Sequence, residues 1–228
     1  MKVWIYVEGP SDRSGLDAFW EEWRLRLKQA HWGIQVIPLD NKSRFFRKIG
    51  PRAAEKLLAN SHDLVVGLPD YYPNQPNPAK EYPHATLEEL CNLQYRLVRD
   101  ILVQKAADVN GLIQRFYPSA LKHDLEMLLL AAREQLCAHL GTPDSIGQQW
   151  QHPVENQNQN RPPKRVVEEL YLTKKGKAYR DTKDAGTVLG NVNNLRQILY
   201  SQSGQLLECP VFKSMLDWIG SRTGVRAY

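Results

Sequence analysis

The fold is decided by residues 2–12, KVWIYVEGPSD, in which an apolar run ends on a glutamate and a turn. Lys2–Val7 is predicted to form a buried strand, because the continuous run Val3–Val7 consists of strong β-formers. Ser11 is the expected N-cap of a helix that follows, with Asp12 in its first turn. Glu8 therefore stands at the tip of a predicted buried strand, either as a solvated loop residue or as a ligand.

The residues that follow repeat this pattern of strand and helix. A strand is predicted at Ile34–Leu39 and another at Asp63–Leu68, with a basic helical region between them that we expect to break near Gly50-Pro51. The helix before the first of these carries apolar residues at three- and four-residue spacing: Leu16, Phe19, Trp20, Trp23 and Leu27. Short connections between alternating strands and helices predict right-handed crossovers and a parallel sheet.

The remainder of the chain is predicted to be mostly helical. The expected elements are a proline-rich loop at Tyr71–Pro83, a helix at Thr86–Ala107, a fourth strand at Leu112–Tyr117, a leucine-rich helical stretch over residues 121–140, a polar loop at Gly141–Asn160, and helices at Pro162–Leu172, about Ala185–Tyr200 and Cys209–Arg222. We therefore predict an α/β fold, a parallel β-sheet sandwiched by helices. Residues 1–140 form its core, and residues 141–228 form a basic helical C-terminal elaboration packed on that core.

Composition narrows the class of protein. The chain has 228 residues, 42% of them hydrophobic and 24% charged, which is ordinary for a globular domain. Its three cysteines have neither metal-ligand nor redox spacing, which favours a reducing, cytoplasmic setting. No apolar run approaches the roughly 20 residues of a membrane span, and the N-terminus does not have the pattern of a signal peptide.

Basic residues gather in two stretches of a chain whose formal net charge is +5. Between Lys42 and Lys56 there are six Lys or Arg against one acid, and between Arg161 and Lys183 there are eight against three. Such clusters can contact a phosphate backbone, and they can equally form solvated helix faces. From the second stretch we predict nucleic-acid contacts for Lys164, Arg165, Lys175 and Arg180, and from the proline-rich loop for Tyr72, whose ring could stack on a base.

Two carboxylates are predicted to meet at one edge of the sheet. Glu8 follows the first strand and Asp70 follows the third, and ligand sites of open α/β sheets lie at the carboxyl ends of the strands. Carboxylate oxygens suit Mg²⁺ or Mn²⁺, which can activate water for attack on a phosphoryl group. The alternatives are that Glu8 bonds the backbone amides of the next helix and that Asp70 is a turn residue.

The motifs IYVEGPSD and LVVGLPDYY together resemble the TOPRIM signature, a glutamate after the first strand and an Asp-x-Asp after a later one. The segments RFYPSALKHDLEMLLLA, RPPKRVVEELY, KAYRDTKDAG and CPVFKSMLDWI are similar, in order and spacing, to blocks of a bacterial TOPRIM-like family of unknown function. The resemblance runs over nearly the whole chain. It implies a TOPRIM-like fold related to nucleases of the overcoming-lysogenization-defect (OLD) type.

The resemblance also implies roles for individual residues. Glu8 matches the TOPRIM glutamate and Asp70 the first acid of Asp-x-Asp, while Tyr72 stands where the second acid is expected. Glu126, in a His-acid-x-Glu block, would replace that acid if its helix begins at the same sheet edge, so the implied metal ligands are Glu8, Asp70 and Glu126.

The resemblance also bears on three further kinds of residue in these blocks. His123 is either a catalytic residue or a hydrogen-bonded structural histidine; at three-residue spacing it would share a helix face with Glu126. Asp124 is expected to point elsewhere, as an N-terminal dipole partner. Lys183, or next Lys164, would stabilise phosphoryl charge.

Two functions are consistent with these residues. The first is a Mg²⁺- or Mn²⁺-dependent phosphodiesterase, a nuclease acting on DNA or RNA. The resemblance implies a role as effector of an antiviral (anti-phage) defence system with an ATPase partner protein, since the chain itself has no phosphate-binding loop motif. The second is a catalytically inactive module that binds nucleic acid or a partner protein, which the missing second acid favours. An oligomer is compatible with either function.

Overall fold

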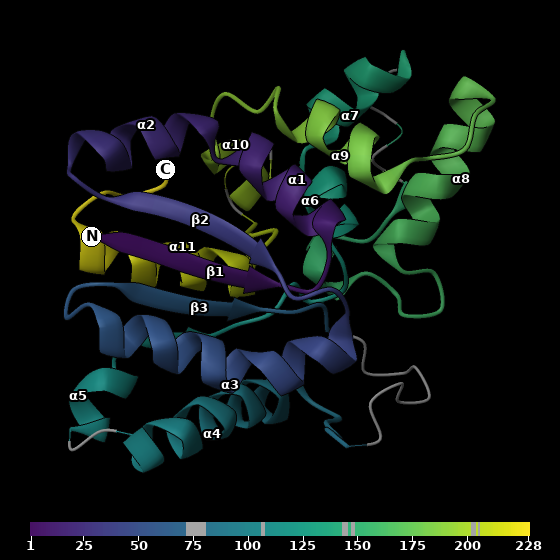
Figure 1. The fold of residues 1–228 in the computed structure, drawn as a ribbon. Helices are drawn as coiled ribbons and strands as arrows, with labels where there is room; N and C mark the ends of the chain where they lie inside the picture. The colour runs from purple at the N-terminus through teal and green to yellow at the C-terminus, as the bar shows by residue number, and fades with distance from the viewer. Residues whose placement is uncertain (72–80, 106–107, 143–145, 147–148, 202–203, 205) are drawn as a thin grey trace.

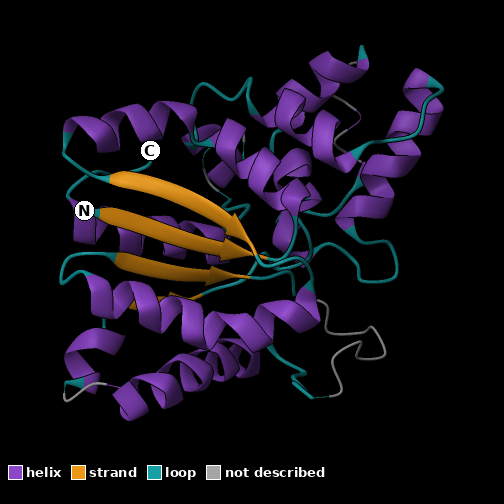
Figure 2. Cartoon of the chain, in the orientation of Figure 1, coloured by secondary structure: helices purple, strands orange, loops and turns teal. Residues whose placement is uncertain are grey.

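Four parallel strands form the single sheet of the described chain, in the order β2-β1-β3-β4. The computed structural model describes residues 1–71, 81–105, 108–142, 146, 149–201, 204 and 206–228. The strands are β1 (Lys2–Val7), β2 (Gly33–Pro38), β3 (Leu64–Leu68) and β4 (Phe116–Pro118). The first strand has the predicted bounds, and β2 lies one residue earlier than expected. The α/β class, with a parallel sheet between helices, is confirmed (Figure 2).

The helices before β4 cover both faces of the sheet. They are α1 (Pro10–Phe19), α2 (Glu21–Gln29), α3 (Lys42–Ala59), α4 (Leu87–Lys105) and α5 (Val109–Ile113). Side chains alternate along a strand, so Val3, Ile5 and Val7 pack with α1 and α2, while Tyr6 packs with α3. Figure 1 shows α3 and α4 together on the second face of the sheet.

The C-terminal half adds helices to the first face. They are α6 (Glu126–Ala131), α7 (Arg133–Leu140), the short 3₁₀ helix η2 (Val154–Asn156), α8 (Pro163–Lys175), α9 (Asp181–Leu189), α10 (Arg196–Leu199) and α11 (Pro210–Thr223). Their buried side chains join those of α1 and β1 in one hydrophobic cluster. The C-terminal half and the N-terminal half therefore share a core on this face. None of the helices in the described part of the chain is both long and apolar enough to cross a membrane.

Three expected elements differ from the structure for local reasons. The helix α3 continues through Pro51, because Gly50 lets the backbone of α4 approach: a Cβ at position 50 would lie 2.5 Å from the Leu97 carbonyl oxygen. The strand expected at Leu112–Tyr117 is mostly wrong, since the Asp108 side chain accepts from the Gly111 amide at 2.8 Å and caps α5 there. The helix expected from Ala185 to Tyr200 divides after Leu189.

Two more expected helices are also divided. The apolar stripe from Leu16 to Leu27 breaks at Trp20, whose fully buried ring stacks on Phe212 with centroids 6.1 Å apart. The leucine-rich stretch breaks at Ala132, and its first helix starts only at Glu126. The start of α6 at Glu126 leaves the preceding residues as an irregular connection from β4.

Candidate functional site

Glu8 and Asp70 meet at the carboxyl edge of the sheet. They follow β1 and β3, the two central strands, which lie side by side where the strand order reverses. The Asp70 amide donates a hydrogen bond of 3.2 Å to Glu8 Oε1. The strand tips point toward the region where α1, α6 and α8 gather (Figure 1). Two residues 62 positions apart in sequence are thus neighbours, as the parallel sheet predicts.

Asp12 joins this edge from the first turn of α1. The N-cap is Gly9, not Ser11, and Pro10 occupies the first helical position, where its missing N–H costs nothing. Asp12 Oδ2 accepts from the Gly9 amide at 2.9 Å, and the side chain is only 6% exposed. The capping interaction holds a buried carboxylate four residues after Glu8.

Asp124 and Glu126 reach the same edge from the connection after β4. Parallel pairing of β3 and β4 continues past the ends of both strands, since the Tyr71 amide donates to the Leu121 carbonyl at 2.7 Å. Both carboxylates are 3% exposed, and Asp124 Oδ2 accepts from the Lys164 amide at 3.3 Å. Asp124 is an N-terminal dipole partner as expected, since its carboxylate accepts from an amide in the first turn of α8, but it does not point elsewhere: it lies close enough to Asp70 to raise the pKa of that acid.

We call Glu8, Asp12, Asp70, Asp124 and Glu126 the carboxylate cluster. Burial raises the pKa of every member, and for Glu8 to about 7. For Asp70 the next causes are the negative charges of Asp12, Glu8, Asp124 and Glu126, in that order. The acids thus disfavour ionisation of one another. Such mutually raised pKa values are expected where the carboxylates outnumber the positive groups that could balance them.

Two lysines lie against the carboxylate cluster. Lys42, at the first position of α3 and 8% exposed, donates from Nζ to the Asp70 carbonyl at 3.1 Å and lowers the pKa of Glu8. Lys164, in the first turn of α8, lowers the pKa of Asp12, Asp124 and Glu126, and its Nζ lies 3.5 Å from Asp181 Oδ2. Lys183, which the sequence analysis placed first for stabilising phosphoryl charge, is instead exposed on α9.

His123 does not share a helix face with Glu126. It precedes α6, so the three-residue spacing falls outside the helix. The ring is buried, hydrogen-bonds to the backbone of Glu155, and has its pKa lowered mainly by burial. This is the environment of a structural histidine, and a catalytic role for His123 is not tested.

The predicted nucleic-acid contacts are partly occupied within the chain. Arg165 Nε lies 3.2 Å from Glu169, Arg180 binds Asp184 at 3.0 Å, and Lys175 Nζ lies 3.0 Å from His139 Nε2. Tyr72 lies outside the described residues. Lys164 is the member of this set that borders the carboxylate cluster, which connects the basic stretch to the candidate site.

The metal roles of Glu8, Asp70 and Glu126 stay a prediction. Among the residues that the structure describes, no group of three or more His, Cys, Asp or Glu side chains is placed to hold a metal ion. The three predicted ligands are at the same edge, but they are not arranged as a ready coordination shell.

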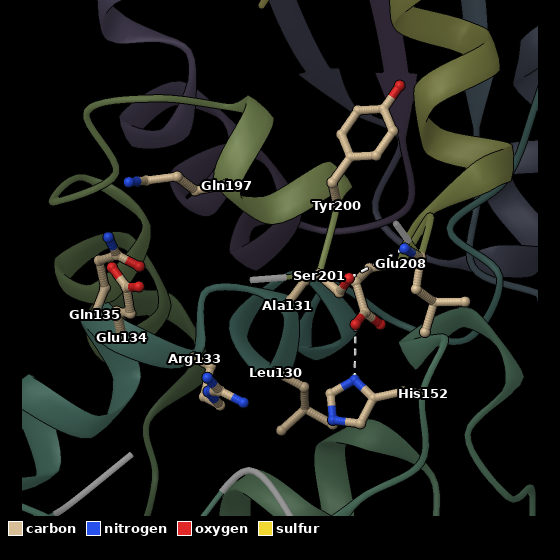
Figure 3. A pocket seen from close by; sticks show the side chains of 11 residues that line it. Leu130, Ala131, Arg133, Glu134, Gln135, His152, Gln197, Tyr200, Ser201 and Glu208 are labelled. Carbon is tan, nitrogen blue, oxygen red and sulfur yellow. Dashed lines mark hydrogen bonds and ion pairs between the residues drawn. The ribbon is translucent and has the colours of Figure 1, made fainter. Parts of the chain in front are cut away.

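A separate cavity of about 330 Å³ lies between the start of α7 and the segment before α11 (Figure 3). Its wall includes Arg133, His152 and Glu208, with His152 Nδ1 2.8 Å from Glu208 Oε1. The other oxygen of Glu208 accepts from the Val154 amide at 3.0 Å. This buried carboxylate is held by the protein on both oxygens.

Comparison with known proteins gives structural neighbours only. No protein-family model matches this sequence, and no curated protein matches it. The C-terminal region of the Burkholderia pseudomallei OLD protein is similar at 16% identity and a TM-score of 0.45, over 97% of this chain and 98% of that chain. The C-terminal region of the Xanthomonas campestris pv. campestris OLD protein is similar at 16% identity and a TM-score of 0.42, over 97% and 95%. The function below is therefore argued from the residues of this chain.

Proposed function

We propose that this chain is a metal-dependent phosphodiesterase, a nuclease that cleaves DNA or RNA. One observation carries the proposal: five carboxylates from three separate segments, three of them buried and two half-buried, converge at the carboxyl edge of the sheet, beside Lys42 and Lys164. A buried group of acids is costly to fold unless a cation balances it. Phosphodiester hydrolysis at such an edge needs that cation and a positive group near the phosphate.

The chemistry of the cluster suits Mg²⁺ or Mn²⁺. All its donors are carboxylate oxygens, the ligands that hard divalent cations prefer. Asp124 Oδ1 is buried and has no hydrogen-bond partner in the described part of the chain. This oxygen is therefore available as a metal ligand. Glu8, Asp70 and Glu126 would hold the ion, with Asp12 and Asp124 as further ligands after side-chain rearrangement. When bound, the ion supplies an activated water and offsets charge on the phosphate.

The protein's own residues then have distinct tasks. Asp124 and Glu126 stand in for the second acid that Tyr72 replaces. Lys164 is placed to bind a phosphoryl oxygen near Glu126, and it takes precedence over Lys183 because Lys183 is exposed. Lys42 keeps Glu8 and Asp70 compatible with burial when no cation is present.

The test is cleavage of a panel of nucleic acids, single- and double-stranded DNA and RNA, with Mg²⁺, Mn²⁺ or EDTA. We expect cleavage that needs the metal and is lost in Glu8→Gln. Glu22→Gln is the matched control, because Glu22 is an exposed residue of α2. Cleavage that survives Glu8→Gln while remaining metal-dependent would place the active site elsewhere.

The second candidate is an inactive module that binds nucleic acid or a partner protein. It is favoured by the arrangement of the acids, since among the described residues no three are placed to hold an ion. Failure to cut any substrate with either metal, alone or with an ATPase partner, would support it. The antiviral role and the ATPase partner remain proposals that rest on the sequence resemblance. The cytoplasmic setting remains a proposal that rests on the spacing of the cysteines, and the division into a core at residues 1–140 and an elaboration at residues 141–228 remains one that rests on the predicted elements.

A further inference from the structure

A polar cavity of about 390 Å³ lies directly beside the carboxylate cluster. Its wall is made by Tyr71, Lys122, His123 and the loop Glu155–Asn160. Tyr71 follows Asp70 in the chain and His123 precedes Asp124, so the two connections that deliver acids to the cluster also line the cavity. The volume is within the range of small-molecule sites, roughly 300–1,000 Å³.

One wall of this cavity is the amide-rich loop ENQNQN, residues 155–160. Two of its side chains hold the loop by hydrogen bonds to the backbone of other segments. Glu155 is fully buried and accepts from the Val211 and Phe212 amides at 2.9 and 3.0 Å. Gln157 accepts from the Gln151 amide and donates to the Arg161 carbonyl, both at 2.8 Å. A low-complexity stretch is thus held in one conformation, while Asn158 and Asn160 remain exposed.

The residues of the cavity match the chemistry of a nucleobase. A base has a flat apolar face and an edge of alternating donors and acceptors; aromatic rings stack on the face, and Asn or Gln amides pair with the edge. The cavity is lined by the half-buried Tyr71, whose ring is the aromatic surface for a base, by the buried His123 and by several residues with side-chain amides. Lys122, whose Nζ donates to Asn156 Oδ1 at 2.6 Å, adds positive charge near the rim.

We propose that this cavity binds one unpaired nucleobase of the strand whose phosphate lies at the carboxylate cluster. The inference rests on the proposed function and narrows its substrate class to single-stranded or locally unpaired nucleic acid. A base inside a duplex is stacked and paired, so its edge cannot enter a side cavity without being extruded. Selection for unpaired substrate then follows from the cost of that extrusion.

The experiment measures binding, not cleavage, by fluorescence anisotropy in the Glu8→Gln background with Mg²⁺. The probes are a short labelled DNA strand, the same strand with abasic sites at its central positions, and the duplex. We expect the abasic strand and the duplex to bind at least about fivefold more weakly than the intact strand, since the loss of one stacked base has about this effect.

The variant Tyr71→Ala with Asn160→Ala is expected to lose at least about fivefold in affinity for the intact strand and to bind the abasic strand unchanged. Tyr71→Phe keeps the ring and is expected to keep the preference. The control is Tyr95→Ala, because Tyr95 is an exposed tyrosine on α4. Thermal unfolding of each variant confirms that the chain is folded.

The inference is overturned if intact and abasic strands bind alike, if the double variant weakens both equally, or if no strand binds. The proposed function can fail separately. Wild-type protein that never cleaves but prefers intact strands through Tyr71 would refute the nuclease and keep the base site. Cleavage of duplex and single strand at equal rates, unchanged in the double variant, would keep the nuclease and remove the base site.

Discussion

Buried carboxylates occur in two regions of this molecule, and the two regions treat them differently. Glu155 and Glu208, which we call the C-terminal acid pair, are 0% and 4% exposed, and both oxygens of each have a partner within the protein. In the carboxylate cluster Asp12, Asp124 and Glu126 are buried and Glu8 and Asp70 are half-buried, but its acids lie among like charges that raise each other's pKa. Backbone amides bond acids in both regions, including Glu8, Asp12 and Asp124. The difference is the like charge gathered in the cluster, which is typical of a ligand site.

The largest expected difference between the carboxylate cluster and the C-terminal acid pair is in the rate of metal-dependent cleavage. Asp70→Asn removes the acid whose pKa is raised by all four other members of the cluster, and metal-dependent cleavage is expected to fall by about 10³-fold or more. Glu208→Gln, a substitution of the same kind in the C-terminal acid pair, is expected to leave the cleavage rate per folded molecule within about twofold. Initial rates on one labelled strand provide the measurement, and equal losses in the two variants would erase the distinction.

The pH dependence of stability is the next largest effect. The pKa of Glu8 is raised from its ordinary value of 4.5 to about 7, so the folded state holds a proton that the unfolded state releases between these values. Stability without metal is therefore complete below about pH 4.5 and declines as pH rises through about 7, by roughly 2–3 kcal/mol from this group. Urea denaturation from pH 5 to 8 in EDTA measures it.

Two controls accompany the pH experiment. Glu8→Gln cannot ionise, so its stability is expected to fall less over the same range. Mg²⁺ is expected to restore stability at pH 8, because it binds the ionised cluster of the folded state. A metal-free wild type whose stability rises steadily from pH 5 to 8 would contradict the electrostatic description of the cluster.

Neutral amides are expected to have opposite effects on stability in the two regions. Glu155→Gln leaves one of two buried backbone amides facing an N–H₂ group, and we expect a loss of about 2 kcal/mol in the free energy of unfolding. Asp124→Asn in the cluster removes a repulsive charge and is expected to leave metal-free stability equal or higher. Urea denaturation at pH 7 compares the two, and a loss of stability in both would show that the cluster is structural.

The smallest predicted effect concerns the lysine beside the cluster. Lys164→Met is expected to reduce metal-dependent cleavage by about tenfold, because a positive group near Glu126 and the phosphate is lost. Lys183→Met is expected to change the rate by less than about twofold, since Lys183 is exposed on α9. The reverse order would return the phosphoryl role to Lys183.

Local pattern predicted the parts of the fold that local forces determine. β1 was predicted to the residue, because its apolar run and the turn after it are both local signals, and the meeting of Glu8 with Asp70 follows from parallel strands alone. The breaks at Trp20 and Ala132 and the continuity of α3 through Pro51 depend on contacts with distant segments, such as Phe212 and Leu97. No pattern within a short window contains that information.

The candidate site was predicted in part for the same reason. Asp12 carried a usable signal, an acid three residues after Gly9 at a helix start, which is the spacing of a capping residue. Lys42 and the orientation of Asp124 carried none, because each depends on how α3 or the connection after β4 meets the sheet edge. Sequence reasoning named Glu8 and Asp70, which follow strands, and the family resemblance named Glu126, but neither named Asp12 or Asp124 as a member of the site.

Gly15 of α1 has a consequence for how this chain can vary. A Cβ at position 15 would lie 2.5 Å from Leu125 Cδ2, so the Leu125 side chain packs directly on the backbone of α1. This contact joins the helix that carries Asp12 to the segment that carries Asp124 and Glu126. The combined volume of the two residues is therefore constrained: a larger residue at 15 can be accommodated only with a smaller one at 125. Among functional variants of this chain, natural or engineered, these two positions are expected to change together.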